Sequence, residues 1–246
     1  MGQAEREKLD RRGLDRRSLD RRGLERALKA ALKPLARAER AQWMRAYVRG
    51  QFEFLGIQAP ELRAAVRPLL RRFAPADAAE LVDEARALWA WREREYQYAA
   101  VELLNCHEKL LTAKDLGALL QLVETKSWWE TVDSLAMVIG RVVRRERKAG
   151  GRAMDRAVRS PNLWVRRVAM IHQLGWRGET DTARLFGYAE RLAPEKEFFI
   201  RKAIGWALRE YSKHDAGAVR AFLESHRDAL SPLTYREAEK RMRRAG

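Results

Sequence analysis

Residues 125–133, with the sequence TKSWWETVD, hold the densest group of side chains capable of chemistry in this 246-residue chain. We expect Ser127 to cap a helix, with Glu130 three residues later completing a capping box. On that helix Trp129 and Asp133 are four residues apart, so an indole and a carboxylate share one face. The alternative is that both tryptophans of the stretch are core residues and that Asp133 is a surface acid paired with a base.

A second candidate helix runs from Pro161 to about Gly175. Within it Arg166 and Arg167 project in different directions, so one can face a ligand while the other meets solvent. Arginine suits a phosphate group because its planar fork donates two parallel hydrogen bonds. The alternative for each is an ordinary solvated arginine.

A third candidate helix, residues 197–213, has two distinct faces. One is an apolar stripe at three- and four-residue steps, formed by Ile200, Ile204, Leu208 and Tyr211. The other interleaves aromatic and cationic side chains: Phe199, Lys202, Trp206, Arg209 and Lys213. Such a surface can stack on sugars or bases and hold phosphates. Gly205 beside Trp206 lacks a side chain where another group can approach closely.

Cofactors, metals and membranes are not expected partners. The chain has one cysteine, four histidines without ligand-like spacing, and neither a glycine-rich phosphate loop nor a Ser–His–Asp pattern. No apolar run approaches the ~20 residues that cross a bilayer, and the N-terminus lacks an apolar stretch of the secretory type. We expect a soluble cytoplasmic protein of the bacterial cytosol or nucleoid.

The formal net charge of +16 predicts a polyanionic partner. Residues 1–26 hold nine basic and six acidic side chains and so contribute little of this excess. Residues 141–167 hold ten basic and only two acidic side chains. A clustered excess on a folded segment favours a nucleic acid over a merely solvated surface, in which acids would be scattered among the bases.

The elements that must position these residues are almost all predicted helices. Apolar residues recur at three- and four-residue steps, and no alternating run indicates a strand. Serine–proline pairs at Ser160–Pro161 and Ser231–Pro232 mark the clearest helix starts. We expect an all-α solenoid of about 11–13 helices, stacked as antiparallel pairs with a concave surface; a compact bundle is the alternative.

The N-terminal segment, residues 1–26, contains the five-residue repeat LDRRG. Steps of five residues advance ~140° around a helix, so the repeated leucines spiral instead of forming one stripe. We expect a low-complexity basic extension, either disordered or a solvated helix. A single domain would follow over residues 27–246.

Five strings together resemble the AlkD-like DNA alkylation repair family, in order from about Arg37 to Arg243. They are FEFLGI (52–57), KSWWETVD (126–133), NLWVRR (162–167), EFFIRKAIGWALREYSK (197–213) and LSPLTYREA (230–238). The tryptophan–aspartate string and the GWALREY string carry most of the specificity. The resemblance implies a HEAT-like helical-repeat DNA glycosylase of base excision repair. Its substrate would be duplex DNA carrying purines alkylated at N3 or N7, such as 3-methyladenine or 7-methylguanine.

The resemblance also implies roles for individual residues. Asp133, Trp129 and Trp206 match positions that surround the deoxyribose of the lesion. Arg167 matches a phosphate-contacting arginine, and Tyr47 matches an aromatic residue near the site. The other expected DNA contacts are Lys126, Arg166, Phe199, Lys202 and Arg209. The basic cluster at residues 141–167 then reads as a duplex footprint beside the proposed catalytic carboxylate.

The implied chemistry needs little general acid, because an alkylated purine is already cationic and leaves readily. A carboxylate would stabilise an oxocarbenium-like sugar and could orient or deprotonate water. Glu130 stands where the family commonly has aspartate, which should not disturb Asp133. We expect a monomeric, monofunctional glycosylase that leaves an abasic site. The main alternative is a non-catalytic repeat protein that binds damaged or branched DNA; a protein-binding scaffold is a third hypothesis.

Overall fold

The structure, a computed structural model, describes residues 19–240 of the chain. Within that range the chain forms thirteen α-helices and no β-strand, with isolated bridges at Leu19–Phe73 and Glu53–Glu93. The all-α class predicted from the sequence is therefore confirmed. The chain divides into two compact units, the first ending at Leu111 and the second starting at Thr112. The single domain over residues 27–246 stays a prediction, and each unit is described by itself.

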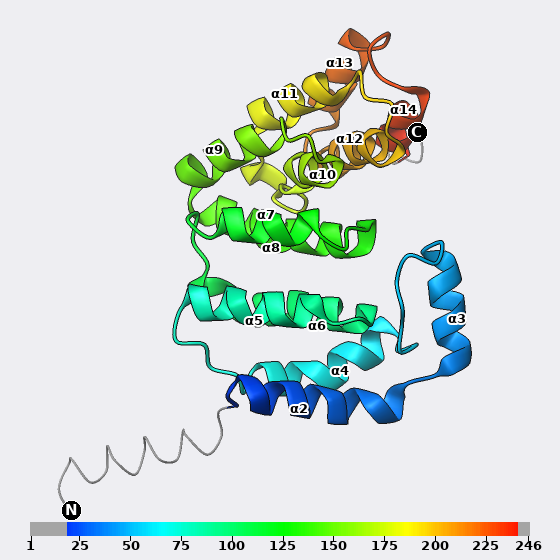
Figure 1. The fold of residues 1–246 in the computed structure, drawn as a ribbon. Coiled ribbons are helices and arrows are strands. Elements are labelled where there is room, and N and C mark those ends of the chain that lie inside the picture. The colour runs from blue at the N-terminus through cyan, green and yellow to red at the C-terminus, as the bar shows by residue number, and fades with distance from the viewer. Residues whose placement is uncertain (1–18, 241–246) are drawn as a thin grey trace, which may run out of the picture. The chain divides into compact units, whose positions relative to one another are not determined.

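The first unit contains five α-helices, drawn in blue to cyan-green in Figure 1. They are α2 (Arg21–Leu32), α3 (Ala38–Tyr47), α4 (Ala59–Leu70), α5 (Ala78–Ala90) and α6 (Arg94–Cys106), with 3-10 turns at Lys33–Leu35 and Glu108–Leu110. Helix α6 packs on α4 and α5, and α2 packs on α4. These contacts bury one face of each of the four helices.

Helix α2 begins inside the segment predicted to be an extension. Asp20 caps it by accepting a hydrogen bond from the backbone N–H of Gly23 at 2.7 Å. Leu24, Leu28 and Leu32 are fully buried. The extension predicted to reach residue 26 therefore ends earlier, because from Leu24 onward the leucines recur every four residues and form one stripe. The rest of the repeat, residues 1–18, lies outside the described part of the chain.

Helix α3 is held at its N-terminal end by the loop that follows it. The buried carboxylate of Glu95 accepts hydrogen bonds from the backbone N–H groups of residues 55, 56 and 57 at 2.9, 2.9 and 3.0 Å. Gly56 adopts φ +84°. A Cβ at Gly56 would lie 2.1 Å from the carbonyl oxygen of Arg37 and 2.7 Å from the backbone nitrogen of Ala41. Only glycine therefore allows α3 to approach this loop so closely.

We predict that Gly56→Ala destabilises the protein more than Gly50→Ala. Both positions have positive φ, +84° and +73°, so both substitutions incur backbone strain of about 1–2 kcal/mol. Nothing lies within 4 Å of a Cβ at Gly50, whereas at Gly56 the new methyl group would also collide with the backbone of α3. Urea unfolding of both variants measures the difference. Equal free-energy losses would show that the contact between α3 and the loop is not tight.

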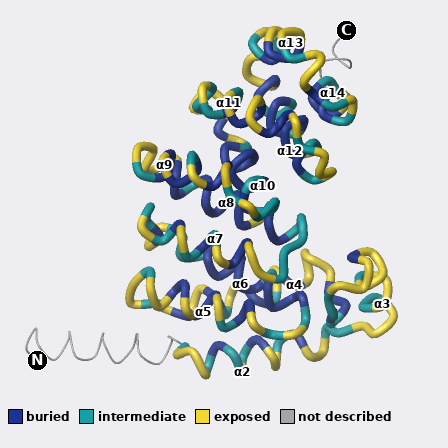
Figure 2. The backbone as a smooth tube through the Cα atoms, turned by 45° about the horizontal axis from the view of Figure 1, so that its top comes forward, coloured by how far each residue is buried: buried dark blue, intermediate teal, exposed yellow. Residues whose placement is uncertain are grey.

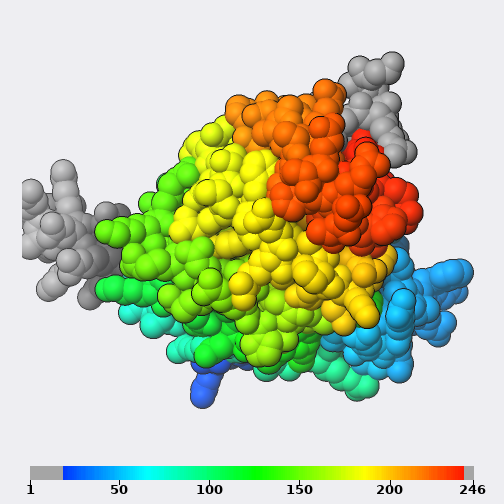
Figure 3. Space-filling view, turned by 90° about the horizontal axis from the view of Figure 1, so that it is seen from above, coloured from blue at the N-terminus to red at the C-terminus, as the bar shows by residue number. Residues whose placement is uncertain are grey.

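The second unit contains eight α-helices. They are α7 (Leu116–Glu124), α8 (Trp129–Arg145), α9 (Arg147–Ala157), α10 (Leu163–Ile171), α11 (Thr182–Leu192), α12 (Phe198–Tyr211), α13 (Ala216–Ser225) and α14 (Pro232–Glu239), with a 3-10 turn at Arg177–Glu179. Every second helix belongs to one row, in which α8 packs on α10, α10 on α12 and α12 on α14. Helices α7, α9 and α11 lie on the other side of this row (Figure 2). Figure 3 shows α11 in yellow beside α13 in orange, joined by Phe186 stacked on Phe222.

The apolar stripe predicted for residues 197–213 lies in the core of this second unit. Ile200, Ile204 and Leu208 have no exposed surface, and Tyr211 is buried. Gly205 faces α14, where an added Cβ would lie 2.5 Å from the Cβ of Glu237. The close approach predicted at Gly205 is thus made by a neighbouring helix of the same chain.

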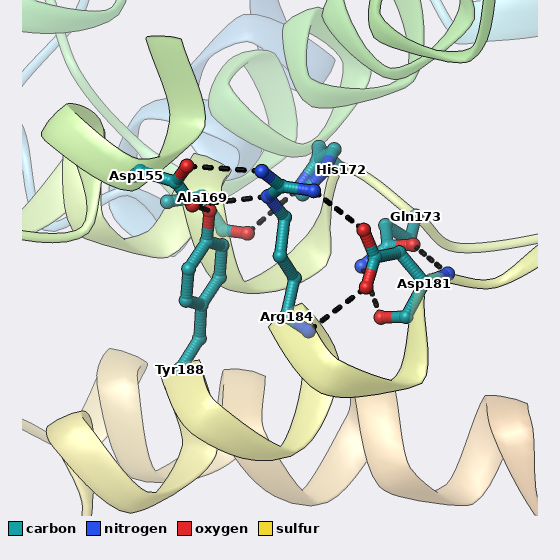
Figure 4. A network of polar contacts seen from close by, with 7 residues as sticks. All are labelled: Asp155, Ala169, His172, Gln173, Asp181, Arg184 and Tyr188. Carbon is teal, nitrogen blue, oxygen red and sulfur yellow. Dashed lines mark hydrogen bonds and ion pairs between the residues drawn. The ribbon is translucent and has the colours of Figure 1, made fainter. Parts of the chain in front are cut away.

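A polar network joins α9, α10 and α11 (Figure 4). Arg184 donates from Nε and Nη2 to the two carboxylate oxygens of Asp155, both at 3.0 Å, and from Nη1 to Asp181 at 2.5 Å. The Tyr188 hydroxyl donates to Asp155 at 2.6 Å. These bonds hold the pKa of Asp155 below its usual value, with the Arg184 hydrogen bonds as the largest cause.

His172 lies at the end of α10 in the same network. It is 1% exposed, and its Nδ1 is 2.7 Å from the carbonyl oxygen of Ala169, which requires that nitrogen to carry the proton. The pKa of His172 is lowered to about 4, mainly because the ring is buried, and the charge of Arg184 acts in the same direction. The imidazole is therefore neutral in the folded protein at neutral pH.

This neutral histidine predicts that the protein loses stability on mild acidification. Between pH 6.5 and about 4 the unfolded chain protonates His172 and the folded chain does not. The free energy of unfolding therefore falls as pH falls, by about 2 kcal/mol from this group between pH 7 and pH 5. Urea unfolding of the wild type and of His172→Phe at both pH values isolates this contribution. A variant with the same pH dependence as the wild type would contradict the assignment.

Candidate functional site

Asp133 and Arg167 form a buried, bidentate ion pair between α8 and α10. Nε of Arg167 donates to Oδ1 of Asp133 at 2.7 Å, and Nη2 donates to Oδ2 at 2.8 Å. Their side chains are only 14% and 4% exposed, respectively. The fork of the arginine therefore fixes the orientation of the carboxylate.

Arg167 also binds a third helix. Its Nη1 donates to the carbonyl oxygen of Phe199, in the first turn of α12, at 2.6 Å. Asp133 lies in the second turn of α8 and Arg167 in the middle of α10, so one guanidinium links these two helices to the N-terminal end of α12. A phosphate contact by Arg167 stays a prediction; in the described structure its guanidinium is turned to the interior and holds Asp133.

Two opposing effects act on the Asp133 carboxylate. Burial disfavours its charged form, whereas the hydrogen bonds and the positive charge of Arg167 favour it. Burial is the larger cause, so the pKa of Asp133 is raised above its usual value. Arg167 limits this rise, because its hydrogen bonds and charge favour the ionised form of the enclosed carboxylate.

Three aromatic rings pack together beside the ion pair. The ring centroids of Trp164 and Phe199 are 4.8 Å apart, and Trp128 lies 5.5 Å from Phe199 and 6.1 Å from Trp164. Trp128 has a buried indole N–H with no hydrogen-bond acceptor among the described residues. No sequence pattern joined these three residues, because they come from the starts of three different helices.

The other two proposed catalytic residues, Trp129 and Trp206, are partly exposed. Trp129 is the first residue of α8 and lies one turn before Asp133, as expected from their spacing. Trp206 lies in the middle of α12, on the face that also carries Phe199 and is separate from the buried apolar stripe. Their roles around a deoxyribose stay a prediction.

Three of the predicted DNA contacts already have partners within the protein. Arg209 pairs with Glu237 at 2.7 Å. Arg166 pairs with Glu195 at 2.6 Å and also donates to two backbone carbonyls. Phe199 belongs to the aromatic cluster. Each of these side chains is therefore engaged within the protein, and a direct contact with DNA stays a prediction for each.

The two lysines differ in setting. Lys202 is exposed, with its ammonium group 5.6 Å from the centroid of the Phe198 ring. Lys126 has φ +48° in the turn that leads into α8. A non-glycine residue in this conformation is strained, and such strain is common near functional sites.

Tyr47 lies in the first unit, at the C-terminal end of α3. It is 69% exposed, and Trp43, one turn earlier on the same helix, is 79% exposed. Tyr47 was predicted to lie near the site only because of the family resemblance, and Trp43 was not predicted. The pair shows an i, i+4 spacing, which could have identified it.

Two predicted helix starts are wrong and one is confirmed. Trp128 occupies the N-cap of α8 without a side-chain cap bond, and Ser127 instead donates to the carbonyl oxygen of Val123 at 2.6 Å. Helix α10 is capped by Asn162 and not by Ser160. Ser231 caps α14 as predicted, accepting from the backbone N–H of Thr234 at 3.1 Å. Serine and asparagine side chains can bond to several nearby backbone groups, so the capping residue is not fixed by residue type alone.

Residues 19–240 contain neither a metal-binding cluster nor a membrane-spanning helix. No group of three or more histidine, cysteine, aspartate or glutamate side chains between residues 19 and 240 could hold a metal ion. No helix in that range is long and apolar enough to cross a lipid bilayer.

Most of the chain matches one known protein family. The family model described as "DNA alkylation repair enzyme" matches residues 28–242. The chain belongs to this family. No curated protein matches the chain.

Solved structures agree with membership of the DNA alkylation repair enzyme family. A protein described as a predicted DNA alkylation repair enzyme from Enterococcus faecalis is 33% identical, with a TM-score of 0.77 over 83% of this chain and 95% of that chain. AlkD2 from Streptococcus mutans is 21% identical, with a TM-score of 0.55 over 67% and 82% of the two chains. A further Streptococcus mutans UA159 structure has the same identity and TM-score, over 67% and 84%. These likenesses confirm the predicted HEAT-like fold.

For this member of the DNA alkylation repair enzyme family, we predict that Arg167→Met is strongly destabilising. It would leave Asp133 buried and unpaired, which costs about 3–5 kcal/mol. Adding Asp133→Asn should recover part of the loss because the isolated charge is removed. The neighbouring Arg166→Met is the matched control: its pair with Glu195 is more exposed, at 16% and 22%, so its cost should be nearer 1 kcal/mol.

A double-mutant cycle by urea unfolding measures the coupling between Asp133 and Arg167. Additive effects of Arg167→Met and Asp133→Asn would show that the pair does not form in solution.

Proposed function

We propose that this protein is a monofunctional DNA glycosylase of base excision repair. Its reaction would be hydrolysis of the N-glycosidic bond of cationic alkylpurines, of the 3-methyladenine and 7-methylguanine type, in duplex DNA. The observation that carries the proposal is the enclosed Asp133 carboxylate, held by both of its oxygens to Arg167 beside an aromatic cluster. Membership of a DNA alkylation repair family supports DNA as the substrate.

The chemistry of the substrate explains why one fixed carboxylate is enough. Alkylation at N3 or N7 gives the purine a positive charge, so it leaves as a neutral base without protonation. The bond breaks with positive charge developing on the sugar. A preoriented carboxylate stabilises that charge most strongly where water is excluded. Glycoside hydrolases use carboxylates against the same kind of transition state.

Arg167 would determine the form in which Asp133 meets the substrate. A carboxylate buried without a partner takes up a proton and loses the charge that the reaction needs. The bidentate pair keeps Asp133 ionised and leaves lone pairs on both oxygens free to face a sugar or a water molecule. Arg167 is therefore proposed as a positioning residue for Asp133.

Trp129 and Trp206 would add attraction for the same developing charge. A tryptophan ring face contributes ~0.5–2 kcal/mol to binding a cation, depending on desolvation. Both side chains are partly exposed and so are accessible to DNA. Lys126 and Lys202 are proposed as phosphate contacts, which leaves an abasic site as the final product without a Schiff-base step.

The experiment that tests the proposal uses methylated duplex DNA. Released 7-methylguanine and 3-methyladenine are quantified chromatographically for the wild type and for Asp133→Asn. We expect Asp133→Asn to lower the single-turnover rate by about 10²–10³-fold, the usual effect of removing one preorganised electrostatic group. Asp155→Asn is the matched control, since Asp155 is also an arginine-paired carboxylate but lies on α9.

The outcomes separate the enzyme from a non-catalytic binding protein. Release by the wild type and by Asp155→Asn, but not by Asp133→Asn, supports the glycosylase. Binding of methylated DNA with no release above the spontaneous rate would leave the non-catalytic reading and refute the proposed activity.

A further inference from the structure

The basic cluster at residues 141–167 is not a single surface. Four of its ten cations are bound to carboxylates: Arg144 and Arg147 to Glu179, Arg166 to Glu195 and Arg167 to Asp133. Those charges are neutralised within the fold. The excess of the cluster must therefore be carried by the cations that remain.

Four of the remaining cations form one row, which we call the α9 stripe. It consists of Lys148, Arg152 and Arg156 on α9 and Arg159 in the turn that follows this helix, at steps of four, four and three residues. All four are exposed, and none makes a side-chain hydrogen bond or ion pair with any residue between 19 and 240. At a rise of 1.5 Å per residue the row is about 16 Å long.

The α9 stripe faces away from the Asp133 site. The buried residues of α9 are Gly150, Gly151, Ala153, Met154 and Ala157. Four of them lie on the opposite side of the helix from the stripe, and Gly151 is covered by the side chain of Arg184. That buried side contacts α8 and α10, the helices that carry Asp133 and Arg167. Figure 2 shows exposed residues along the outer edge of α9. The stripe therefore lies on the side of α9 that faces away from α8 and α10.

Folding does not account for this row. Like charges four residues apart on a helix destabilise it by about 0.2–0.5 kcal/mol per pair. The one acid on α9, Asp155, is engaged by Arg184 and Tyr188, and its pKa is also lowered by the charge of Arg159. A polyanion would remove the repulsion between the four cations.

A hollow beside α9 extends the positive surface towards α11. Its volume is about 690 Å³, and its lining includes Arg159 and Arg191. The side chain of Arg191 also has no hydrogen bond or ion pair within the described chain. Glu195 in the same lining is paired with Arg166. Glu190, the other acid of the lining, is hydrogen-bonded to His226 at 2.7 Å. Arg159 and Arg191 are therefore the charged side chains of the lining without a partner among the described residues.

We propose that the α9 stripe, with Arg191, binds the phosphate backbone of a second DNA segment while the first occupies the Asp133 site. A regular row of cations suits a backbone that carries one charge per ~1.7 Å of duplex axis. A membrane is a poorer match, because a helix that lies in a bilayer needs an exposed apolar face and the apolar residues of α9 are buried. The proposal rests on the proposed function in one respect, that the Asp133 site binds DNA.

A bridging assay tests the second contact on the full-length protein. One undamaged duplex is immobilised, and capture of a second, fluorescent duplex is measured as a function of salt. The stripe variant is Lys148→Gln/Arg152→Gln/Arg156→Gln/Arg159→Gln. The matched control removes the same charge from scattered exposed sites: Lys109→Gln/Lys114→Gln/Arg220→Gln/Arg236→Gln.

We expect the wild type and the control to capture the second duplex, and the stripe variant to lose capture by about tenfold or more at 0.1 M salt. The slope of log K against log salt should fall by about 0.9 for each phosphate contact removed. Circular dichroism and urea unfolding establish that the stripe variant is folded. Capture by the stripe variant equal to that of the control overturns the proposal.

Two further arms separate other outcomes. Capture of phosphatidylserine vesicles or polyglutamate through the same four residues, with no capture of a second duplex, would overturn DNA as the partner. Bridging should persist in Asp133→Asn, because that substitution leaves all four residues of the stripe in place. Bridging without any base release would sink the proposed glycosylase while leaving the second surface intact.

Discussion

The second unit contains a buried ion pair between Asp133 and Arg167, which destabilises the fold unless the two groups are closely aligned. Removing a carboxylate and a guanidinium from water costs several kcal/mol per ion, and mutual attraction offsets this only when both groups are well aligned. Arg167 meets the requirement with two bonds to Asp133 and a third to the Phe199 carbonyl. The stacking of α8, α10 and α12 must therefore be accurate at their N-terminal ends, and that accuracy also positions the aromatic cluster.

The same arrangement answers an electrostatic problem. A carboxylate that stabilises a cationic transition state acts most strongly in a dry, apolar setting, which also favours its neutral form. Burial does raise the pKa of Asp133, and Arg167 opposes that rise. The Phe199 ring of the cluster lies 6.0 Å from the Arg167 guanidinium, and the arginine favours the charged form of Asp133. The ion pair and the aromatic cluster are both built from helices α8, α10 and α12, so the packing of these helices positions both.

Sequence periodicity predicted the features that are repeated along one helix. The buried stripe of α12 and the shared face of Trp129 and Asp133 both follow from three- and four-residue spacing. The pairing of Asp133 with Arg167 could not be read this way, because it joins residues 34 positions apart on different helices. The caps of α8 and α10 were predicted wrongly because Ser127 bonds back to the Val123 carbonyl and Asn162 takes the capping position after Ser160. The early start of α2 was missed because the leucine spacing changes at Leu24.

Net charge proved the least specific of the sequence signals, for a reason that extends beyond this chain. A count of basic residues treats every cation alike, but a guanidinium bound to a carboxylate contributes little field to solvent, whereas unpaired neighbours on one helix reinforce one another. Residues 141–167 contain both kinds: Arg167 acts inside the protein as the partner of Asp133, and the α9 stripe points outward. The two groups are close in sequence yet face opposite sides of α9 and its neighbours. One run of basic residues is therefore divided between an interior ion pair and an exposed row on the outer surface.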